Sequence, residues 1–62
     1  MKGIVKWYNK EKGFGFIGTE DGDYFVHHSF VEGTINEGDK VIFEIKKNKR
    51  GNIASNVKKE RN

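Results

Sequence analysis

The stretch Lys12-Gly13-Phe14-Gly15-Phe16-Ile17-Gly18 predicts a β-strand that carries aromatic rings on its outer face. Successive side chains of a strand point to opposite faces, so Phe14 and Phe16 share one face while Gly15 and Ile17 share the other. Ile17 is the natural core residue, which leaves both phenylalanine rings in water. A flanking glycine also lets another chain approach closely. Exposed clusters of apolar side chains usually mark a binding site, so this strand is a candidate binding surface.

Outward from this stretch, short alternating segments predict five strands, at residues 2–9, 13–19, 24–28, 40–47 and 52–58. Asp21-Gly22 is a hairpin signal between the second and third strands. Residues 29–39 have room for one helical turn, and no segment shows the apolar repeat of a longer helix. The fold class is therefore all-β, a five-stranded antiparallel barrel, because closure removes the exposed edges that a tiny open sheet would leave.

The third predicted strand repeats the pattern of the second. With Val26 in the core, Phe25 and His27 face solvent on the side of the other exposed rings. The opposite parity supplies a predicted core made of Val5, Ile17, Val26, Val41, Phe43, Ile45 and Val57. The competing interpretation is that Phe14, Phe16 and Phe25 are themselves the core, since a 62-residue chain needs large apolar side chains.

Charge is unevenly distributed along the chain. Residues 1–18 contain four lysines and one acid, residues 19–39 contain six acids and no lysine or arginine, and residues 40–62 contain eight basic residues and two acids. The totals give a net charge of +3, from 12 basic and 9 acidic residues. This asymmetry favours a fold with one basic face and one acidic edge.

Lysines flank the exposed rings, namely Lys6, Lys10 and Lys12. Aromatic faces stack on unpaired bases and ammonium groups attract phosphates, so this combination favours single-stranded nucleic acid as the ligand. The alternative is a protein-interaction or self-association module whose aromatic face docks a partner chain or another copy.

Other function classes find little support in the residues. The chain has no cysteine for a disulfide or a thiolate metal site, and no apolar run near the roughly 18 residues of a membrane span. Gly13 to Gly18 matches a dinucleotide-binding pattern, but no helix follows it. His27 and His28 are adjacent in a predicted strand and should point to opposite faces, which disfavours a metal site. Ser29 with His27 and Asp23 resembles a catalytic triad in composition alone, without a cleft.

We therefore expect no enzyme activity, no cofactor, no metal and no small-molecule substrate. The early lysines disfavour a secretory signal peptide, so a cytoplasmic protein is expected. The length predicts one domain over residues 1–62, with a frayed tail at residues 59–62.

Three consecutive stretches resemble a cold-shock domain, and the likeness extends in order over nearly the whole chain. They are Gly3-Ile-Val-Lys-Trp-Tyr-Asn9, Lys12-Gly-Phe-Gly-Phe-Ile17 and Asp23-Tyr-Phe-Val-His27, followed by residues 37–41, 43–45 and 54–57. The resemblance implies a five-stranded oligonucleotide-binding barrel, the OB-fold, that binds single-stranded RNA and DNA. It also implies a role in loosening RNA secondary structure, or in transcription or translation under cold or general stress.

The resemblance also assigns roles to individual residues. Base-stacking positions correspond to Trp7, Phe14, Phe16, Phe25 and His27. Backbone or polar contacts correspond to Lys6, Asn9, Lys12, Asp23 and Arg50. Strict alternation would put Trp7 in the core beside Val5, so its exposure requires a bulge or twist near the strand end.

The chain departs from the family pattern at three places. His28 stands where another phenylalanine is usual, and the loop at residues 29–39 is short and lacks its common aromatic. Phe30 either compensates for that loss by stacking or packs beneath the loop. Asn52 replaces a proline of the last turn. We expect a monomer with a modest preference for pyrimidines; the residues leave open whether RNA or DNA is the working ligand.

Overall fold

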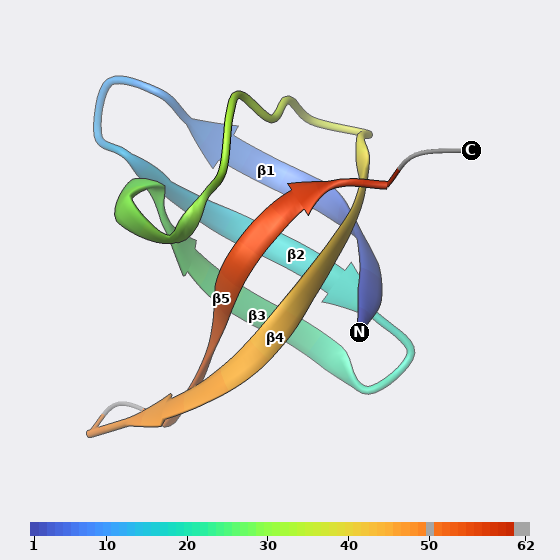
Figure 1. The fold of residues 1–62 in the computed structure, drawn as a ribbon, viewed down its shortest axis with the longest axis vertical. Coiled ribbons are helices and arrows are strands. Elements are labelled where there is room, and N and C mark those ends of the chain that lie inside the picture. Colours follow the sequence, from blue (N-terminus) through green and yellow to red (C-terminus); the bar gives the residue numbers. More distant parts are fainter. Residues whose placement is uncertain (50, 61–62) are drawn as a thin grey trace.

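Five strands and one turn of 3-10 helix build the chain, whose computed structural model describes residues 1–49 and 51–60 (Figure 1). In chain order the elements are β1 (Lys2–Asn9), β2 (Phe14–Thr19), β3 (Gly22–His27), η1 (His28–Phe30), β4 (Lys40–Asn48) and β5 (Gly51–Lys59). The number and order of the predicted strands are confirmed. β3 begins at the glycine of the predicted hairpin turn and ends one residue earlier than expected, where η1 starts.

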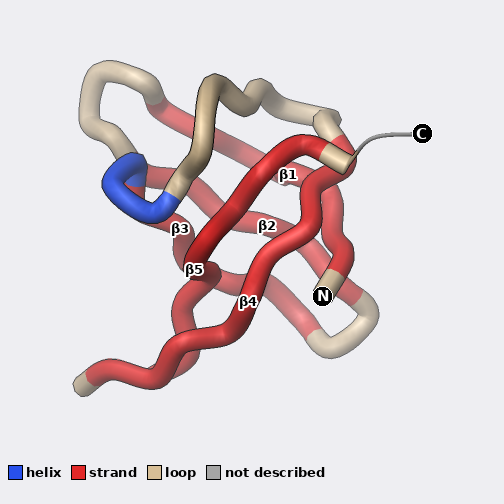
Figure 2. The backbone as a smooth tube through the Cα atoms, in the orientation of Figure 1, coloured by secondary structure: helices blue, strands red, loops and turns tan. Residues whose placement is uncertain are grey.

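The strands close into a barrel in the order β1-β2-β3-β5-β4, with β4 returning to pair with β1 (Figure 2). The all-β OB-fold barrel expected from the sequence is confirmed. One pair, β3 with β5, is parallel rather than antiparallel, through Phe25 opposite Ile53 and Val26 opposite Ala54. Parallel neighbours need a crossover connection, which here consists of η1, the loop at residues 31–39 and β4.

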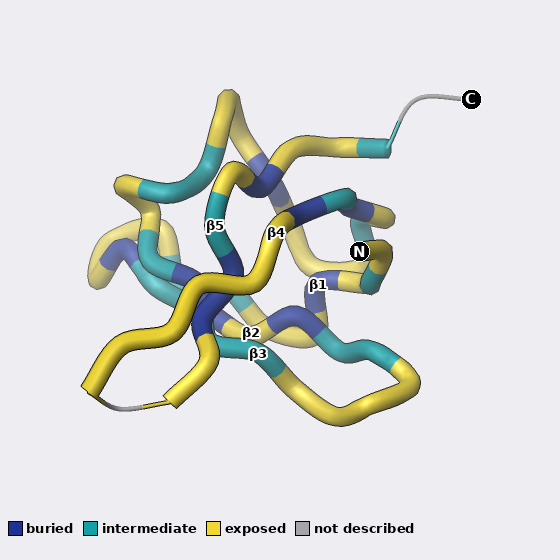
Figure 3. The backbone as a smooth tube through the Cα atoms, turned by 60° about the horizontal axis from the view of Figure 1, so that its bottom comes forward, coloured by how far each residue is buried: buried dark blue, intermediate teal, exposed yellow. Residues whose placement is uncertain are grey.

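The barrel encloses one apolar core of Val5, Ile17, Val26, Ile35, Val41, Phe43, Ala54 and Val57. The prediction that Ile45 lies in the core is wrong, because its side chain is 43% exposed. It pairs with Ala54 where the β4–β5 hairpin begins to extend beyond the barrel, as Figure 1 shows. The outer part of this hairpin is exposed in Figure 3, and residues 44–49 of the chain are all exposed.

The loop at residues 31–39 belongs to the core as well as to the surface. Ile35 is fully buried although it lies in no strand. The Glu32 N–H donates to the Val57 carbonyl (2.7 Å) and the Gly38 N–H donates to the Val5 carbonyl (2.8 Å). These bonds hold both ends of the loop against the barrel, so Ile35 is positioned by backbone contacts on either side of it.

A bulge in β1 turns Trp7 outward. Val5 pairs with Ile17, but Trp7 pairs with Phe16, so Lys6 is an extra residue on β1. The carbon chain of Lys6 lies against Gly18 on the outer face, and Trp7 lies beside Phe16 on the same face. The bulge that the exposure of Trp7 requires is therefore present, and it separates Trp7 from the core residue Val5.

Lys59, the first residue of the tail expected to fray, belongs to β5. Lys59 pairs with Val41 in the sheet, and the Glu60 N–H donates to the Lys40 carbonyl at 2.9 Å. The Glu60 carboxylate also forms an ion pair with the Lys2 ammonium at 2.9 Å. Arg61 and Asn62 lie outside the described residues. Within residues 1–49 and 51–60, no helix has the length and apolar character that crossing a membrane would require.

Candidate nucleic-acid interface

Four aromatic rings form one continuous outer surface on β1, β2 and β3, here called the aromatic platform: Trp7, Phe14, Phe16 and Phe25. Trp7 lies 5.4 Å from Phe14 and 6.3 Å from Phe16 between ring centroids. Phe25 lies 5.8 Å from Phe14 and 5.9 Å from Phe16. Each ring therefore contacts two others, and the four close into a single patch.

The platform lies outside the hydrophobic core. Trp7 is 40% exposed and Phe16 is 39% exposed, while Phe14 and Phe25 are half-buried against their ring neighbours. None of the four is among the buried core residues, so the interpretation of the phenylalanines as the core is wrong. Strand register explains the arrangement, because Trp7 is opposite Phe16 and Phe16 is opposite Phe25.

Two histidines extend the patch at the end of β3. His27 is opposite Phe14 in the sheet, and its Nδ1 accepts from the Ser29 N–H at 3.3 Å. The ring centroids of His27 and His28 are 4.4 Å apart. The expectation that they point to opposite faces is wrong, because β3 ends at His27 and His28 already belongs to η1. Within the described part of the chain, no group of three or more potential metal-ligating side chains surrounds them.

The predicted polar residues differ in the contacts that their side chains make. The Lys6 ammonium pairs with the Asp23 carboxylate at 3.0 Å, and both side chains are largely exposed. Asn9 Oδ1 accepts from the Lys12 N–H at 3.0 Å, and the Asn9 carbonyl accepts from the Gly13 N–H at 2.8 Å. Asn9 thus shapes the turn that presents Lys12, whose side chain is exposed.

Phe30 and Arg50 complete the predicted set. Phe30 is half-buried in η1, and the Lys46 ammonium lies over its ring, 5.3 Å from the centroid. Arg50 lies outside the described residues. The structure thus gathers four of the five predicted stacking residues into the platform, with His27 at its edge.

Comparison with known proteins places the chain in a family. A model described as the "'Cold-shock' DNA-binding domain" matches residues 1–60. The cold shock-like protein CspG of Escherichia coli K12 is 48% identical over 63 aligned residues, covering 92% of this chain and 90% of that protein. The major cold shock protein of Streptococcus pyogenes serotype M1 is also 48% identical, with 94% of each chain covered.

The chain belongs to the cold-shock domain family. Its members are nucleic-acid-binding proteins and not enzymes, so the chain has a nucleic-acid-binding role. An outer patch of contacting rings beside exposed lysines is chemically suited to that role, because bases offer planar faces and phosphates offer negative charge.

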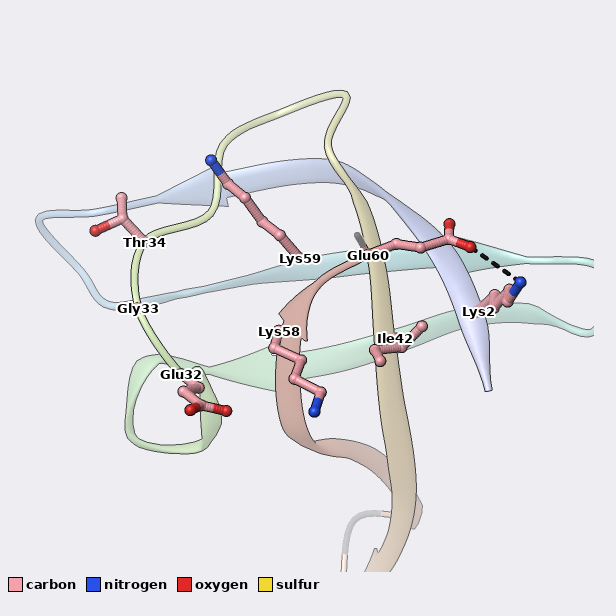
Figure 4. A pocket seen from close by; sticks show the side chains of 8 residues that line it. All are labelled: Lys2, Glu32, Gly33, Thr34, Ile42, Lys58, Lys59 and Glu60. Carbon is pink, nitrogen blue, oxygen red and sulfur yellow. Dashed lines mark ion pairs between the residues drawn. The ribbon is translucent and has the colours of Figure 1, made fainter. Parts of the chain in front are cut away.

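A separate cavity of about 800 Å³ lies where β1, β4, β5 and the loop after η1 meet (Figure 4). It is lined by Lys2, Glu32, Gly33, Thr34, Ile42, Lys58, Lys59 and Glu60. Lys2 is paired with Glu60 at 2.9 Å, and Lys59 is paired with Asp39 at 3.5 Å. Among these described lining residues there is no aromatic side chain on which a base could stack, so the platform is the better candidate for the cold-shock domain's ligand.

Sequence reasoning missed Ile53, which borders the platform. Ile53 is only 7% exposed, lies outside the core cluster and is opposite Phe25. Alternation from the core residue Val57 would have placed Ile53 inside. A second register shift prevents this. Between two consecutive cross-strand pairs, β5 advances by three residues while β4 advances by two, and Asn56 in this segment adopts a φ of 51°. Asparagine is one of the few residues that tolerate this backbone conformation, and its presence in a strand was the available signal.

Gly15 brings two strands of this barrel together and does not open the surface to another chain. Gly15 is buried, and any side chain there would collide with the Trp7 carbonyl oxygen and with Tyr8. The glycine therefore lets β1 and β2 approach each other closely beneath the platform.

Gly15→Ala is expected to lower the free energy of unfolding by about 1–3 kcal/mol, because the added methyl group must push β1 away from β2. Oligonucleotide binding should weaken as well, since Trp7 and Phe16 lie on these two strands. Gly18→Ala is the matched control in the same strand, because the atoms nearest to its added methyl group belong to the Lys6 side chain, which can move. Urea unfolding of the two variants measures the loss of stability. An equal loss of unfolding free energy in both variants would contradict this packing argument.

Proposed function

We propose that this cold-shock domain binds single-stranded RNA and DNA by stacking unpaired bases on the aromatic platform. The observation that supports this most is the patch of four rings on one outer face, each in contact with two others and none in the core. Base stacking on an aromatic side chain contributes about 1–3 kcal/mol per base, enough for a few rings to capture a strand. In a duplex the bases are already stacked and paired, so unpaired segments are the preferred ligand.

Charged residues beside the platform hold the sugar–phosphate chain in this proposal. Lys6, Lys10 and Lys12 are exposed around it. Lys6 must exchange Asp23 for a phosphate, which is easy because a surface ion pair is worth only about 0–1 kcal/mol. The released Asp23 carboxylate then accepts hydrogen bonds from base N–H groups.

Selectivity among sequences should be modest and lean toward pyrimidines, because every base has a face that can stack. Capture of unpaired segments opposes the re-formation of RNA secondary structure, so we propose action as a monomeric RNA chaperone or regulator of transcription or translation in the cytoplasm. The names of the related proteins, which refer to cold shock, support a stress-linked role.

Oligothymidylate or oligouridylate is expected to quench the fluorescence of Trp7, the single tryptophan of the chain. With about four phosphates neutralised, the slope of log affinity against log salt should be near −3 for a single strand. A fluorescence titration at several salt concentrations measures this slope, with duplex DNA of the same length as the control ligand.

An affinity that does not depend on salt concentration would contradict the proposal. Equal quenching of Trp7 fluorescence by duplex and by single-stranded DNA would contradict it too. An oligonucleotide without effect, together with concentration-dependent association of the protein, would favour the alternative of a self-association module. Sedimentation of the free protein over a range of concentrations separates these two cases.

A further inference from the structure

The outer surface of the barrel continues beyond the platform. In the sheet Trp7 is opposite Phe16, Phe16 is opposite Phe25 and Phe25 is opposite Ile53. Ile53 in turn is opposite Lys46 on β4. Since paired residues in a sheet point to the same side, one row of side chains crosses all five strands. It begins with aromatic rings, passes over an apolar residue and ends on a cation.

Phe30 lies at the far end of this row. η1 packs against β5, and the Lys46 ammonium lies over the Phe30 ring at 5.3 Å from its centroid. A cation at this distance from a ring face is attracted by it. Phe30 is only half-buried, so its ring is neither sealed beneath the loop nor left bare. Lys46 covers the face on which a base would stack.

We propose that Phe30, Ile53 and Lys46 form a further subsite for one unpaired nucleotide of the strand held by the platform, an inference that rests on the proposed function. The base stacks on Phe30 in place of the ammonium group, and the ammonium moves to the phosphate of that nucleotide. Stacking of a base on an aromatic ring is worth more than an exposed cation–π contact, so the exchange favours binding. The flexible four-carbon chain of lysine permits the movement.

The surroundings of this subsite suit a polyanion. Lys46, Lys47 and Lys49 are all exposed on the β4–β5 hairpin, which extends beyond the barrel (Figure 1). Ile53 is opposite Phe25 and Lys46, so a largely buried apolar side chain lies between the platform and the Lys46 end of the row. The positive charge and the continuity with the platform thus both indicate that the occupant is the nucleic-acid strand that the platform binds.

The test measures the binding of two oligothymidylates. The shorter has one nucleotide for each ring of the platform, and the other is about three nucleotides longer. Phe30→Leu keeps an apolar side chain against β5 but removes the ring face. It should weaken binding of the longer oligonucleotide about fivefold and of the shorter one less than about twofold. Lys46→Ala should weaken binding of the longer one about threefold at low salt, with the effect disappearing at high salt.

Lys47→Ala is the matched control, because it removes the same charge from the next residue of β4, whose side chain points to the other side of the strand. Its effect should be smaller than that of Lys46→Ala. No loss in Phe30→Leu with the longer oligonucleotide, equal loss with both, or equal effects of the two lysine variants would overturn the subsite. In each of these cases, binding of the short oligonucleotide by the unaltered protein would leave the platform proposal standing; its absence would overturn that proposal too.

Discussion

Replacing Phe16 with alanine is expected to weaken oligothymidylate binding by about 1–3 kcal/mol while changing the unfolding temperature little. Phe16 is opposite both Trp7 and Phe25 and contacts both of their rings. It is 39% exposed and takes no part in the core, so its removal costs a stacking surface and not a packed interior. Trp7 quenching measures the affinity, and thermal unfolding measures the stability.

The neighbouring residue supplies the control for this experiment. Ile17 is fully buried on the other face of β2, and Ile17→Val should lower the free energy of unfolding by about 0.5–1.5 kcal/mol without a change in affinity. If Phe16→Ala instead lost stability as a core substitution does, with affinity preserved in the folded fraction, the platform would not be the binding surface.

Ile35→Ala is expected to lower the free energy of unfolding by about 2–5 kcal/mol, the cost of truncating a buried isoleucine. This is large for a chain of 62 residues, whose total stability is on the order of 3–9 kcal/mol at about 0.05–0.15 kcal/mol per residue. The effect arises because this loop side chain packs in the barrel core while the backbone on both sides of it is hydrogen-bonded to β1 and β5.

Thr34→Ala tests whether the loop or the buried side chain is responsible. Thr34 is exposed next to Ile35, and its replacement should change stability by less than about 0.5 kcal/mol. Urea unfolding of the two variants measures the difference. A comparable loss in both would show that the loop conformation, and not the packing of Ile35, stabilises this end of the barrel.

Much of the fold and of the platform could be predicted from alternation alone. Ile17 and Val26 fix the inner faces of β2 and β3, and their parity leaves Phe14, Phe16 and Phe25 outside. Glycines and the Asp21-Gly22 turn mark where the strands end. These signals are local, since each depends only on a few neighbouring residues.

Features set by contacts distant in the chain could not be predicted in this way. The register shift near Asn56 puts Ala54 in the core and Ile53 beside Phe25, against simple alternation. Ile45 fits the apolar pattern of its strand, but it lies in a stretch, residues 44–49, that is exposed. Ile35 carries no periodic signal at all, because a loop has no repeat to reveal its inward position.

The extra residue in β1 has a consequence for how a ligand meets this strand. A regular strand offers only every second side chain to one surface, so a cation and an indole that are adjacent in the chain would be divided between inside and outside. With the bulge, Lys6 and Trp7 reach the same surface as immediate neighbours. In the proposed complex, one nucleotide step would therefore contact the ammonium group and the indole together. Deleting Lys6 from β1 would keep the indole outside but would remove the neighbouring cation.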